Sequence, residues 1–330
     1  MCAFINVLII YRGDYMREIN EVYVNDISLD KILEKHKKWI NNEEGGERAD
    51  LSYTTIRYAN LSNVDLSYAD LIGAELINTD LTGANLRNVD LSGSDLRYTD
   101  LTNADLTCTN LTKVDLSNVD LVNADLVNAD LTGAILTNSD LSYADLSSAN
   151  LRGTNLSNSD LAYAYLKNTF FSNTNLSNVN LTGAYFKDAY LNNVNLTGAN
   201  LNNAGLNCVV LKDIKYDETT KYFTLQCPEE GSFIAYKKAA DNKIVKLLVT
   251  EDAKRSSATS RKCRCSKAKA LSITNIKGTE KYEMAHSNYK KSFVYRVGEI
   301  VEVDNFDNNR WNECSTGIHF FMTREEAVNY

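Results

Sequence analysis

Leucine recurs at every fifth position between residues 51 and 211, and this period dominates the chain. Of the 33 positions in register, 30 hold Leu, and the others hold Ile56, Phe171 and Phe186. Two residues before each stands a small or β-branched residue: 16 Ala, 7 Val, 7 Thr and 3 Ser. A period of five would smear side chains around an α-helix and alternate them between the faces of a flat strand. The pattern therefore predicts a closed coil in which each five-residue unit forms one side, with both residue types pointing inward.

The repeated unit reads A-(D/N)-L-x-x, as at Ala69-Asp70-Leu71 and Ala199-Asn200-Leu201. This unit closely resembles the pentapeptide-repeat superfamily, and the resemblance covers about half of the chain. It implies a mainly β fold, a right-handed quadrilateral β-helix with about 20 residues in each coil. The 33 units would then make about eight coils. At the ~4.8 Å spacing of stacked strands, these coils would form a rod roughly 38 Å long.

The segment before the repeat, residues 1–48, is expected to carry a capping helix. Apolar residues at helical spacing predict an amphipathic helix from Leu29 to Ile40, with Ser28 as its N-cap. A helix laid over the first coil would block end-to-end pairing at the open sheet edge. His36 is interpreted as a packed residue of this cap rather than as a ligand. Residues 1–26 carry little pattern and are expected to add a strand.

Residues 214–330 follow a mixed pattern, so the β-helix is assigned to residues 49–213. Apolar stretches predict strands at 233–238, 243–249 and 292–303. Thr323 and Glu326 predict a capping box at the start of a short helix over 323–330. We therefore expect a C-terminal α+β domain. Its sequence, with CPEEG at 227–231 and GIHFF at 317–321, resembles an uncharacterised domain that follows pentapeptide repeats in phage and bacterial proteins.

Charge is distributed unevenly between these regions. The net charge is −8, and residues 49–213 contribute 18 acids and 8 bases, whereas residues 214–330 contribute 16 acids and 20 bases. The odd number of cysteines, seven, is unlike a disulfide scaffold and favours a reducing compartment. The apolar run at residues 3–10 is too short to span a bilayer and lacks a basic leader. We expect a cytoplasmic protein without membrane contact.

Residues 20 apart should stack on one face of the rod, and two columns of carboxylates follow, here named the acidic ladders. The first ladder is Asp80, Asp100, Asp120, Asp140 and Asp160, and the second is Asp105, Asp125 and Asp145. Neighbouring carboxylates at this spacing repel by roughly 1 kcal/mol in water. The structural interpretation is that Asp and Asn at this turn position hydrogen-bond the local backbone. The functional interpretation is a negatively charged rod that imitates duplex DNA and does not itself bind nucleic acid.

The resemblance gives the second interpretation a partner, because some pentapeptide-repeat proteins are taken to protect DNA gyrase from quinolones in this way. Two features depart from those members. Acid stops at Asp160, and Asn occupies the equivalent position at 175, 180, 195 and 200. The chain also continues into a globular domain, whereas gyrase-binding members typically end in a dimerising helix.

Aromatic residues gather in the last predicted coils. Tyr165 and Tyr185 should stack on one face, and Phe170 and Tyr190 on the adjacent one. Exposed aromatic clusters mark docking surfaces. The partner is predicted to be the chain's own C-terminal domain or a second copy in a homodimer.

The strongest basic segment runs from residue 254 to 269, with seven bases and no acid. It suggests an anion site for phosphate or nucleic acid, formed by Lys254, Arg255, Arg261, Lys262 and Arg264. The alternatives are packing against the acidic rod and a solvated loop.

Cysteine and histidine offer little chemistry. Cys263 and Cys265 with Cys227, Cys314 and His319 could be compared with a zinc site, but the C-x-C gap is narrower than usual. Pairing Cys263 or Cys265 with His286 or His319 as nucleophile and base has no support from spacing. No metal, cofactor or catalytic residue is predicted.

The sequence favours a non-enzymatic interaction or scaffold protein that binds a protein partner through the acidic rod and has a second binding surface on the C-terminal domain. The alternatives are a DNA-mimic regulator of gyrase or another DNA-processing enzyme, and a C-terminal nucleotide-binding or enzymatic module positioned by the rod.

Overall fold

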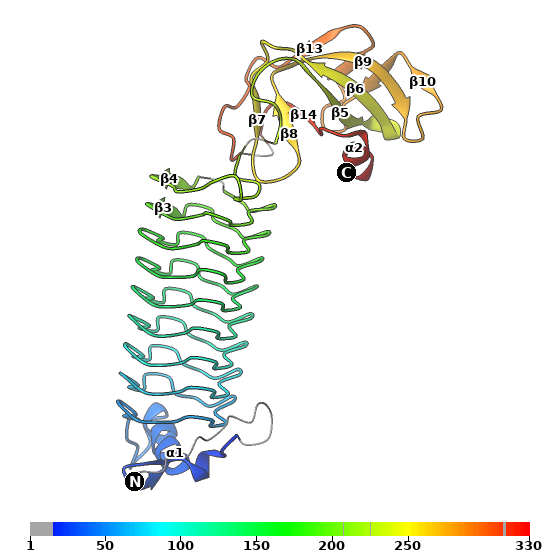
Figure 1. The fold of residues 1–330 in the computed structure, drawn as a ribbon. Helices are drawn as coiled ribbons and strands as arrows, with labels where there is room; N and C mark the ends of the chain where they lie inside the picture. Colours follow the sequence, from blue (N-terminus) through cyan, green and yellow to red (C-terminus); the bar gives the residue numbers. More distant parts are fainter. Residues whose placement is uncertain (1–15, 207, 225, 313–314) are drawn as a thin grey trace, which may run out of the picture. The chain divides into compact units, whose positions relative to one another are not determined.

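The computed structural model describes residues 16–206, 208–224, 226–312 and 315–330. The chain divides into two compact units, Met1–Ser159 and Asp160–Tyr330. Within each unit, residues 20 apart pair through parallel β-bridges, as Asp80 does with Asp100 and Asn175 with Asn195. Four five-residue sides therefore make each coil, and Figure 1 shows successive coils stacked in both units. The β-helix expected from the leucine period is present.

The leucine positions form the interior of the coils. Every residue of the period from Leu51 to Leu206 is at most 1% exposed. The main chain links each coil to the next, because the Leu101 N–H donates to the Asp120 carbonyl at 2.7 Å and the Asp120 N–H donates to the Thr99 carbonyl at 3.1 Å. The inward assignment made from the period is confirmed.

Hydroxyl residues in the second inward position satisfy their hydrogen-bonding groups inside the coil. The Thr79 hydroxyl donates to the Ile56 carbonyl at 2.7 Å, and the Thr109 hydroxyl donates to the Leu86 carbonyl at 2.7 Å. Each bond reaches back to the preceding coil. Burying these hydroxyls is therefore compatible with a stable core, because a buried donor with a partner avoids its desolvation penalty.

The second residue after each leucine turns the corner with a positive φ. Asn103 has a φ of 58° and Gly133 a φ of 69°. Asn and Gly tolerate this left-handed conformation better than other residues, which explains why they are frequent there. Tyr53 also adopts it, with a φ of 58°. A Cβ on Gly73 would lie 2.8 Å from the Tyr53 ring, so a larger residue at Gly73 would displace that ring.

The N-terminal part of the first unit contains η1 (Ile19–Glu21), β1 (Tyr23–Val24), β2 (Ile27–Ser28) and α1 (Leu29–Ile40). Strands β1 and β2 pair antiparallel. Helix α1 spans the predicted residues, and its apolar face contains the buried Leu29. Ser28 occupies the N-cap position, but its side chain makes no capping hydrogen bond.

Contacts join this segment to the first coil. Arg17 forms a parallel bridge with Ala59, which adds a short extended stretch to the coil edge. His36 is fully buried, and its Nδ1 accepts the Ala49 N–H at 3.1 Å. The Trp39 ring meets the Tyr68 ring edge-on at 6.5 Å. His36 is therefore a packed residue at the start of the β-helix, as the sequence suggested.

The coil geometry continues beyond Leu211, where the leucine period ends. Strand β3 (Tyr190–Asn192) pairs in parallel with β4 (Val210–Lys212). Lys215 then bridges to Asn195 and Lys221 to Asn200, and the Thr220 hydroxyl donates to the Leu196 carbonyl at 2.9 Å. The coil therefore extends to Lys221, past the boundary at residue 213 suggested by the leucine period.

A segment from the C-terminal domain closes the edge of this last coil. In an earlier coil the Gly183 N–H donates to the Asn202 carbonyl at 2.8 Å, in the next coil along. The Asn203 N–H instead donates to the Thr259 carbonyl at 3.1 Å. The Thr259 hydroxyl donates in turn to the Ala204 carbonyl. Thr259 thus provides hydrogen bonds where a further coil would lie, which covers an otherwise open sheet edge.

The C-terminal domain is built mainly from short antiparallel strands. Its elements in the described residues are β5 (Phe233–Ala239), η2 (Ala240–Asn242), β6 (Lys243–Val249), β7 (Arg255–Ser257), β8 (Cys263–Cys265), β9 (Lys267–Asn275), β10 (Lys281–Tyr282), β11 (Met284–His286), β12 (Val294–Arg296), β13 (Ile300–Glu302), β14 (Ile318–Phe320) and α2 (Arg324–Asn329). One sheet has the order β10-β9-β6-β5 with β13 also on β9, a second has the order β14-β8-β7, and β11 pairs with β12. Tyr236 of β5 bridges to Phe321, directly after β14, and so connects the first two sheets.

Most elements predicted for this domain occur where the sequence placed them. Strands β5 and β6 match the predictions, and α2 has the predicted capping box between Thr323 and Glu326. The stretch 292–303 forms two strands, β12 and β13, separated by a turn in which Gly298 has a φ of 87°. Helix α2 is the single α-helix among the described residues of 214–330, so the expected α+β character amounts to one short helix on a β domain.

Candidate functional site

The acidic ladders form within the first unit as the period predicts. Parallel bridges connect Asp80, Asp100, Asp120 and Asp140 in the first ladder, and Asp105, Asp125 and Asp145 in the second. Asp160 belongs to the second unit, where it stacks on Asn180. The Asn180 amide donates to both Asp160 carboxylate oxygens at 3.1 Å. The ladders therefore hold successive carboxylates in adjacent coils.

One oxygen of each ladder carboxylate is used by the fold. The Thr102 N–H donates to Asp100 Oδ1 at 2.9 Å, and the Val122 N–H donates to Asp120 Oδ1 at 3.1 Å. Asn110 accepts the Thr112 N–H in the same way, at 3.1 Å. The local turn therefore needs a side-chain oxygen at this position but not a negative charge.

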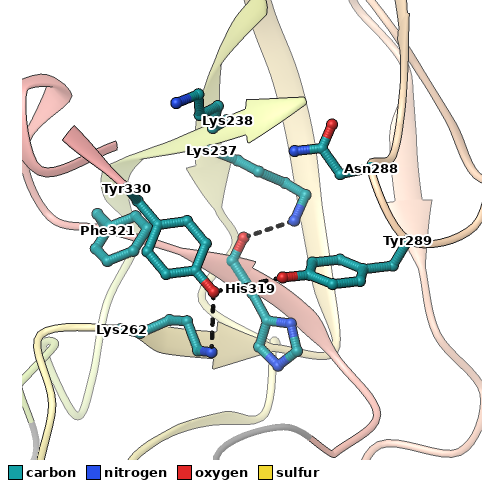
Figure 2. A pocket seen from close by; sticks show the side chains of 8 residues that line it. All are labelled: Lys237, Lys238, Lys262, Asn288, Tyr289, His319, Phe321 and Tyr330. Atoms are coloured by element: carbon teal, nitrogen blue, oxygen red, sulfur yellow. Dashed lines mark hydrogen bonds between the residues drawn. The ribbon is translucent and has the colours of Figure 1, made fainter. Parts of the chain in front are cut away.

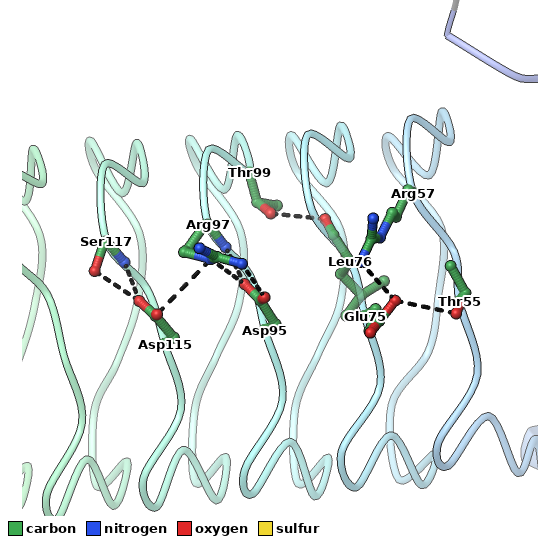
Figure 3. A network of polar contacts seen from close by, with 9 residues as sticks. All are labelled: Thr55, Arg57, Glu75, Leu76, Asp95, Arg97, Thr99, Asp115 and Ser117. Carbon is green, nitrogen blue, oxygen red and sulfur yellow. Dashed lines mark hydrogen bonds and ion pairs between the residues drawn. The ribbon is translucent and has the colours of Figure 1, made fainter. Parts of the chain in front are cut away.

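A neighbouring face of the same coils neutralises its acids with arginine. Arg97 donates to Asp95 through Nε at 2.8 Å and Nη2 at 2.7 Å, and its Nε lies 3.7 Å from Asp115 (Figure 3). Arg57 lies 2.8 Å from Glu75 on that face. Partial burial opposes ionisation of the Asp95 carboxyl, but the hydrogen bonds from Arg97 outweigh it and lower its pKa.

The acidic ladders have no such compensation. Among the residues that the structure describes, no Lys or Arg forms an ion pair with a ladder carboxylate. Arg57 and Arg97 stand on the neighbouring face, whereas Arg87, on the face of the second ladder, forms no ion pair within the described residues. Within the described residues, the ladder carboxylates are therefore not neutralised by an ion pair.

The aromatic patch also forms as expected. Tyr165 bridges to Tyr185, and the Phe170 and Tyr190 rings stack at 5.1 Å. Tyr165 is 55% exposed, and Tyr185 and Tyr190 are 38% and 41% exposed. The rings are thus accessible in the second unit, which also contains the C-terminal domain.

The basic segment is part of the sheets rather than a solvated loop, because residues 255–257 and 263–265 form β7 and β8. Arg255 donates to the main-chain carbonyls of Gly231 at 2.8 Å and Thr250 at 3.0 Å. Arg264 is 2% exposed and donates to the carbonyls of Asp307 at 2.8 Å and Asn309 at 2.5 Å. Both guanidinium groups therefore tie loops to strands.

The other bases of this segment have different partners. Arg261 pairs with Glu326 at 2.6 Å, and Lys254 is exposed. Lys262 Nζ lies 5.5 Å from the centre of the Tyr330 ring and donates to its hydroxyl at 3.5 Å. Of the five predicted anion-site residues, only Lys262 lines the cavity and the small pocket of this domain, both of which are described below.

The cysteines do not resemble a reactive or metal-binding centre. Cys227, Cys263 and Cys265 are buried free thiols, whereas Cys108 and Cys208 are exposed. The neighbouring Cys227 thiol and burial raise the pKa of Cys263, and burial raises the pKa of Cys265 to about 12. The described part of the chain contains no cluster of three metal-ligating side chains. Cys314, named with the zinc comparison, lies outside the described residues.

A cavity in the C-terminal domain was not predicted from the sequence. A space of about 550 Å³ is lined by residues from six separate segments, among them Lys237, Lys262, Tyr289, His319 and Tyr330. The same five residues line an adjoining small pocket of about 20 Å³, shown in Figure 2. Only Lys262 and His319 had been singled out, because the five lie far apart in sequence and follow no shared spacing.

Two further findings concern membrane-spanning helices and similarity to curated proteins. No helix within the described residues has the length and apolar character needed to cross a membrane. A comparison with curated proteins finds no match.

Solved structures of several repeat proteins are similar to this chain. The pentapeptide repeat protein Rfr23 from the cyanobacterium Cyanothece 51142 is 38% identical over 27% of this chain and 61% of its own, with a TM-score of 0.27. HetL from Nostoc sp. strain PCC 7120, involved in heterocyst differentiation regulation, is 28% identical over 54% of this chain and 92% of its own, with a TM-score of 0.25. Trypsin-treated QnrB1, a plasmid-mediated fluoroquinolone resistance protein, is 22% identical over 52% of this chain and 90% of its own, with a TM-score of 0.41.

Two family models match the sequence. A family of unknown function (DUF5758) matches residues 223–327, which covers most of the C-terminal domain. The pentapeptide-repeat model matches overlapping segments that together run from residue 47 to 211, half of the chain. The inward leucines and the 20-residue ladder of bridges are the structural counterpart of that match. The chain therefore belongs to the pentapeptide-repeat family.

Proposed function

We propose that this chain is a non-enzymatic interaction protein whose acidic ladders bind a basic surface on a protein partner. The observation that carries the proposal is the contrast between faces of the same coils. Arg97 neutralises Asp95, whereas the ladder carboxylates have no ion-pair partner among the described residues. Like charges held in adjacent coils disfavour the folded state, and a cationic partner would relieve that repulsion.

The finer form of the proposal is a partner that otherwise binds duplex DNA, with DNA gyrase as the first candidate. Two parallel ladders with ~4.8 Å between carboxylates present about one charge per 2.4 Å. Duplex DNA presents about one charge per 1.7 Å. The ladders therefore offer a charge density of the same order to a surface of Lys and Arg residues. A phosphate-binding surface would gain electrostatic attraction from them at low salt.

Asparagine substitutions give a sharp test, because Asn keeps the turn while it removes the charge. The ladder variant carries Asp100→Asn, Asp120→Asn and Asp140→Asn. The control variant carries Asp70→Asn, Asp90→Asn and Asp130→Asn, which removes three charges from a different column of the same unit. Binding partners are captured from a bacterial lysate at low and high salt and quantified by mass spectrometry against the unmodified chain.

We expect the ladder variant, but not the control variant, to lose a salt-sensitive partner. Purified gyrase is tested in parallel by biolayer interferometry, with duplex DNA as competitor. Loss of a partner other than gyrase would support the acidic-ladder proposal and refute its gyrase form. Equal binding by both variants would show that the ladders are not the interaction surface.

A further inference from the structure

A buried lysine without an acidic partner lies at the cavity of the C-terminal domain. Lys237 belongs to β5 and is only 7% exposed. Its Nζ donates to the His319 carbonyl at 3.1 Å, and no ion pair of Lys237 occurs among the described residues. A carbonyl supplies a hydrogen bond but no counter-charge, so the buried ammonium group carries an uncompensated desolvation penalty.

More cationic and hydrogen-bond-donating groups surround Lys237. The small pocket is lined by Lys237, Lys262 and His319, with no Asp or Glu among its described lining residues (Figure 2). Lys238 also lines it, but its ammonium group points away and donates to the Val328 carbonyl at 3.2 Å. The Asn288 side chain adds an amide to this wall. A pocket with several donors and no carboxylate is suited to an anion, because lysine ammonium groups form strong charge-assisted hydrogen bonds with phosphate oxygens.

Aromatic rings stand beside these cations. The Tyr330 ring centre lies 5.0 Å from the Phe321 ring centre and 5.5 Å from Lys262 Nζ, and its hydroxyl lies 3.4 Å from the Tyr289 hydroxyl. Tyr289 is 78% exposed and Tyr330 is 56% exposed, so both rings are available to a ligand. Exposed aromatic faces next to a phosphate-binding group are suited to stacking against a flat ring.

The larger cavity supplies the remaining space and chemistry. Its volume of about 550 Å³ lies within the range of small-molecule sites. Glu302 and Asp304 line this cavity but not the small pocket. They can accept hydrogen bonds from hydroxyl or amino groups, away from the group that meets the lysines.

We infer that this cavity binds a small phosphorylated molecule of the mononucleotide class. The phosphate would lie at Lys237 and Lys262, and the flat ring against Tyr289 and Tyr330. Hydroxyl or amino groups of the ligand would face Glu302 and Asp304. This site is independent of the acidic ladders, because its residues all belong to the second unit and the ladder residues tested above belong to the first.

The test uses the full chain and calorimetric titration with AMP, GMP, CMP and UMP. Inorganic phosphate and the four unphosphorylated nucleosides are titrated as separate arms. We expect at least one mononucleotide to bind saturably with one site per chain, and to bind at least about tenfold more tightly than its nucleoside, a difference of about 1.4 kcal/mol. No saturable binding of any mononucleotide or of phosphate at about 1 mM would overturn the inference.

Matched variants locate the ligand. Lys262→Gln changes a partly exposed side chain and should weaken mononucleotide binding by at least about tenfold, since it removes a charge-assisted hydrogen bond. Lys246→Gln removes the same charge from β6, outside both cavities, and should change the affinity by less than about twofold. Tyr330→Phe keeps the ring and should retain most of the affinity, whereas Tyr330→Ala should not.

Two outcomes would refute the site as described. Equal weakening by Lys246→Gln and Lys262→Gln would show non-specific charge attraction. Much tighter binding of a single-stranded oligonucleotide than of any mononucleotide would show a nucleic-acid surface instead. The Asp100→Asn, Asp120→Asn and Asp140→Asn ladder variant should bind the mononucleotide as the unmodified chain does. Failure of the acidic-ladder proposal would therefore not affect the mononucleotide result, and the two proposals are tested independently.

Discussion

Replacing Asp120 with Asn should stabilise the β-helix, although it removes a residue from the proposed binding surface. Asp120 stacks between Asp100 and Asp140 in the first acidic ladder. Its Oδ1 accepts the Val122 N–H at 3.1 Å, a bond that the Asn side-chain oxygen can keep. The substitution therefore removes charge repulsion while it preserves the turn.

The magnitude follows from the stacking. Two unit charges ~4.8 Å apart in water repel by about 0.9 kcal/mol, so relief from two neighbours is worth about 1.7 kcal/mol without salt. Screening with a Debye length of about 3 Å at 1 M salt reduces this to roughly 0.3 kcal/mol. The new amide can also donate to a neighbour, as the Asn110 amide does to Asp90 Oδ1 at 3.0 Å. We expect a net gain of about 1–2 kcal/mol at low salt.

Urea unfolding of the full chain at about 10 mM and 1 M NaCl measures the effect. The control is Asp130→Asn, because Asp130 stacks between Asn110 and Asn150 and has no like-charged neighbour in its column. Asp120→Asn should gain stability at low salt and lose most of that gain at high salt, while Asp130→Asn should gain little at either. A salt-independent gain, or an equal gain in the control, would refute repulsion within the ladder.

Three further predictions test the interior and the titrating groups. Leu121→Ala should cost about 2–5 kcal/mol in urea unfolding because Leu121 is fully buried, and an unshifted transition would contradict its inward position. Burial lowers the pKa of Lys237 from 10.5 to about 8, so between these pH values the unfolded chain holds a proton that the folded chain has released, and stability rises with pH. Lys237→Met should therefore be more stable than the unmodified chain by roughly 1–3 kcal/mol at pH 7, with an advantage that shrinks toward pH 10; a constant difference would contradict the shifted pKa. Native maleimide labelling followed by peptide mapping should modify Cys108 and Cys208, which are exposed, well before the buried Cys265, whose pKa burial raises to about 12, and early Cys265 labelling would contradict its burial.

The β-helix could be predicted because one physical requirement repeats along the chain. Each coil must fill the same interior, so Leu recurs, and one period assigns every inward position at once. The same logic located the ladders and the stacked pair Phe170 and Tyr190. The frequent Asn and Gly two residues after each leucine carried a further signal, because a positive φ there requires residues that tolerate it.

The end of the β-helix could not be read from the period. After Leu211 the coil is closed by Thr220, whose hydroxyl takes over the inward hydrogen bond, and then by Thr259 from the C-terminal domain. These contacts use main-chain groups and single hydroxyls, which leave no pattern in the sequence. In the C-terminal domain, Gly298 was the available signal that the stretch 292–303 would be divided by a turn.

The C-terminal cavity was missed for a related reason. Lys237 occupies a core-facing position of β5, between Ala235 and Ala239, and its role depends on β14 lying beside it. The cluster of bases in the sequence indicated Arg255 and Arg264 instead. Their guanidinium groups already donate hydrogen bonds to main-chain carbonyls. A guanidinium group with five donors suits such loop-fixing roles, so a basic run in a sequence does not by itself indicate an anion site.

The sequence allowed two explanations of the acidic ladders, a structural role in the turn and a role in binding, and the structure distinguishes what each requires. The turn requires a side-chain oxygen, and Asn110 shows that an uncharged residue supplies it. Charge at Asp100, Asp120 and Asp140 is therefore additional to what the turn needs, and by the repulsion estimate it destabilises the fold. If Asp120→Asn stabilises the chain while the triple Asn variant loses its partner, the charge serves binding at the expense of stability, as expected for a functional surface. If the substitutions stabilise the chain and binding is unchanged, the carboxylates are tolerated turn residues, and the interaction surface must lie elsewhere.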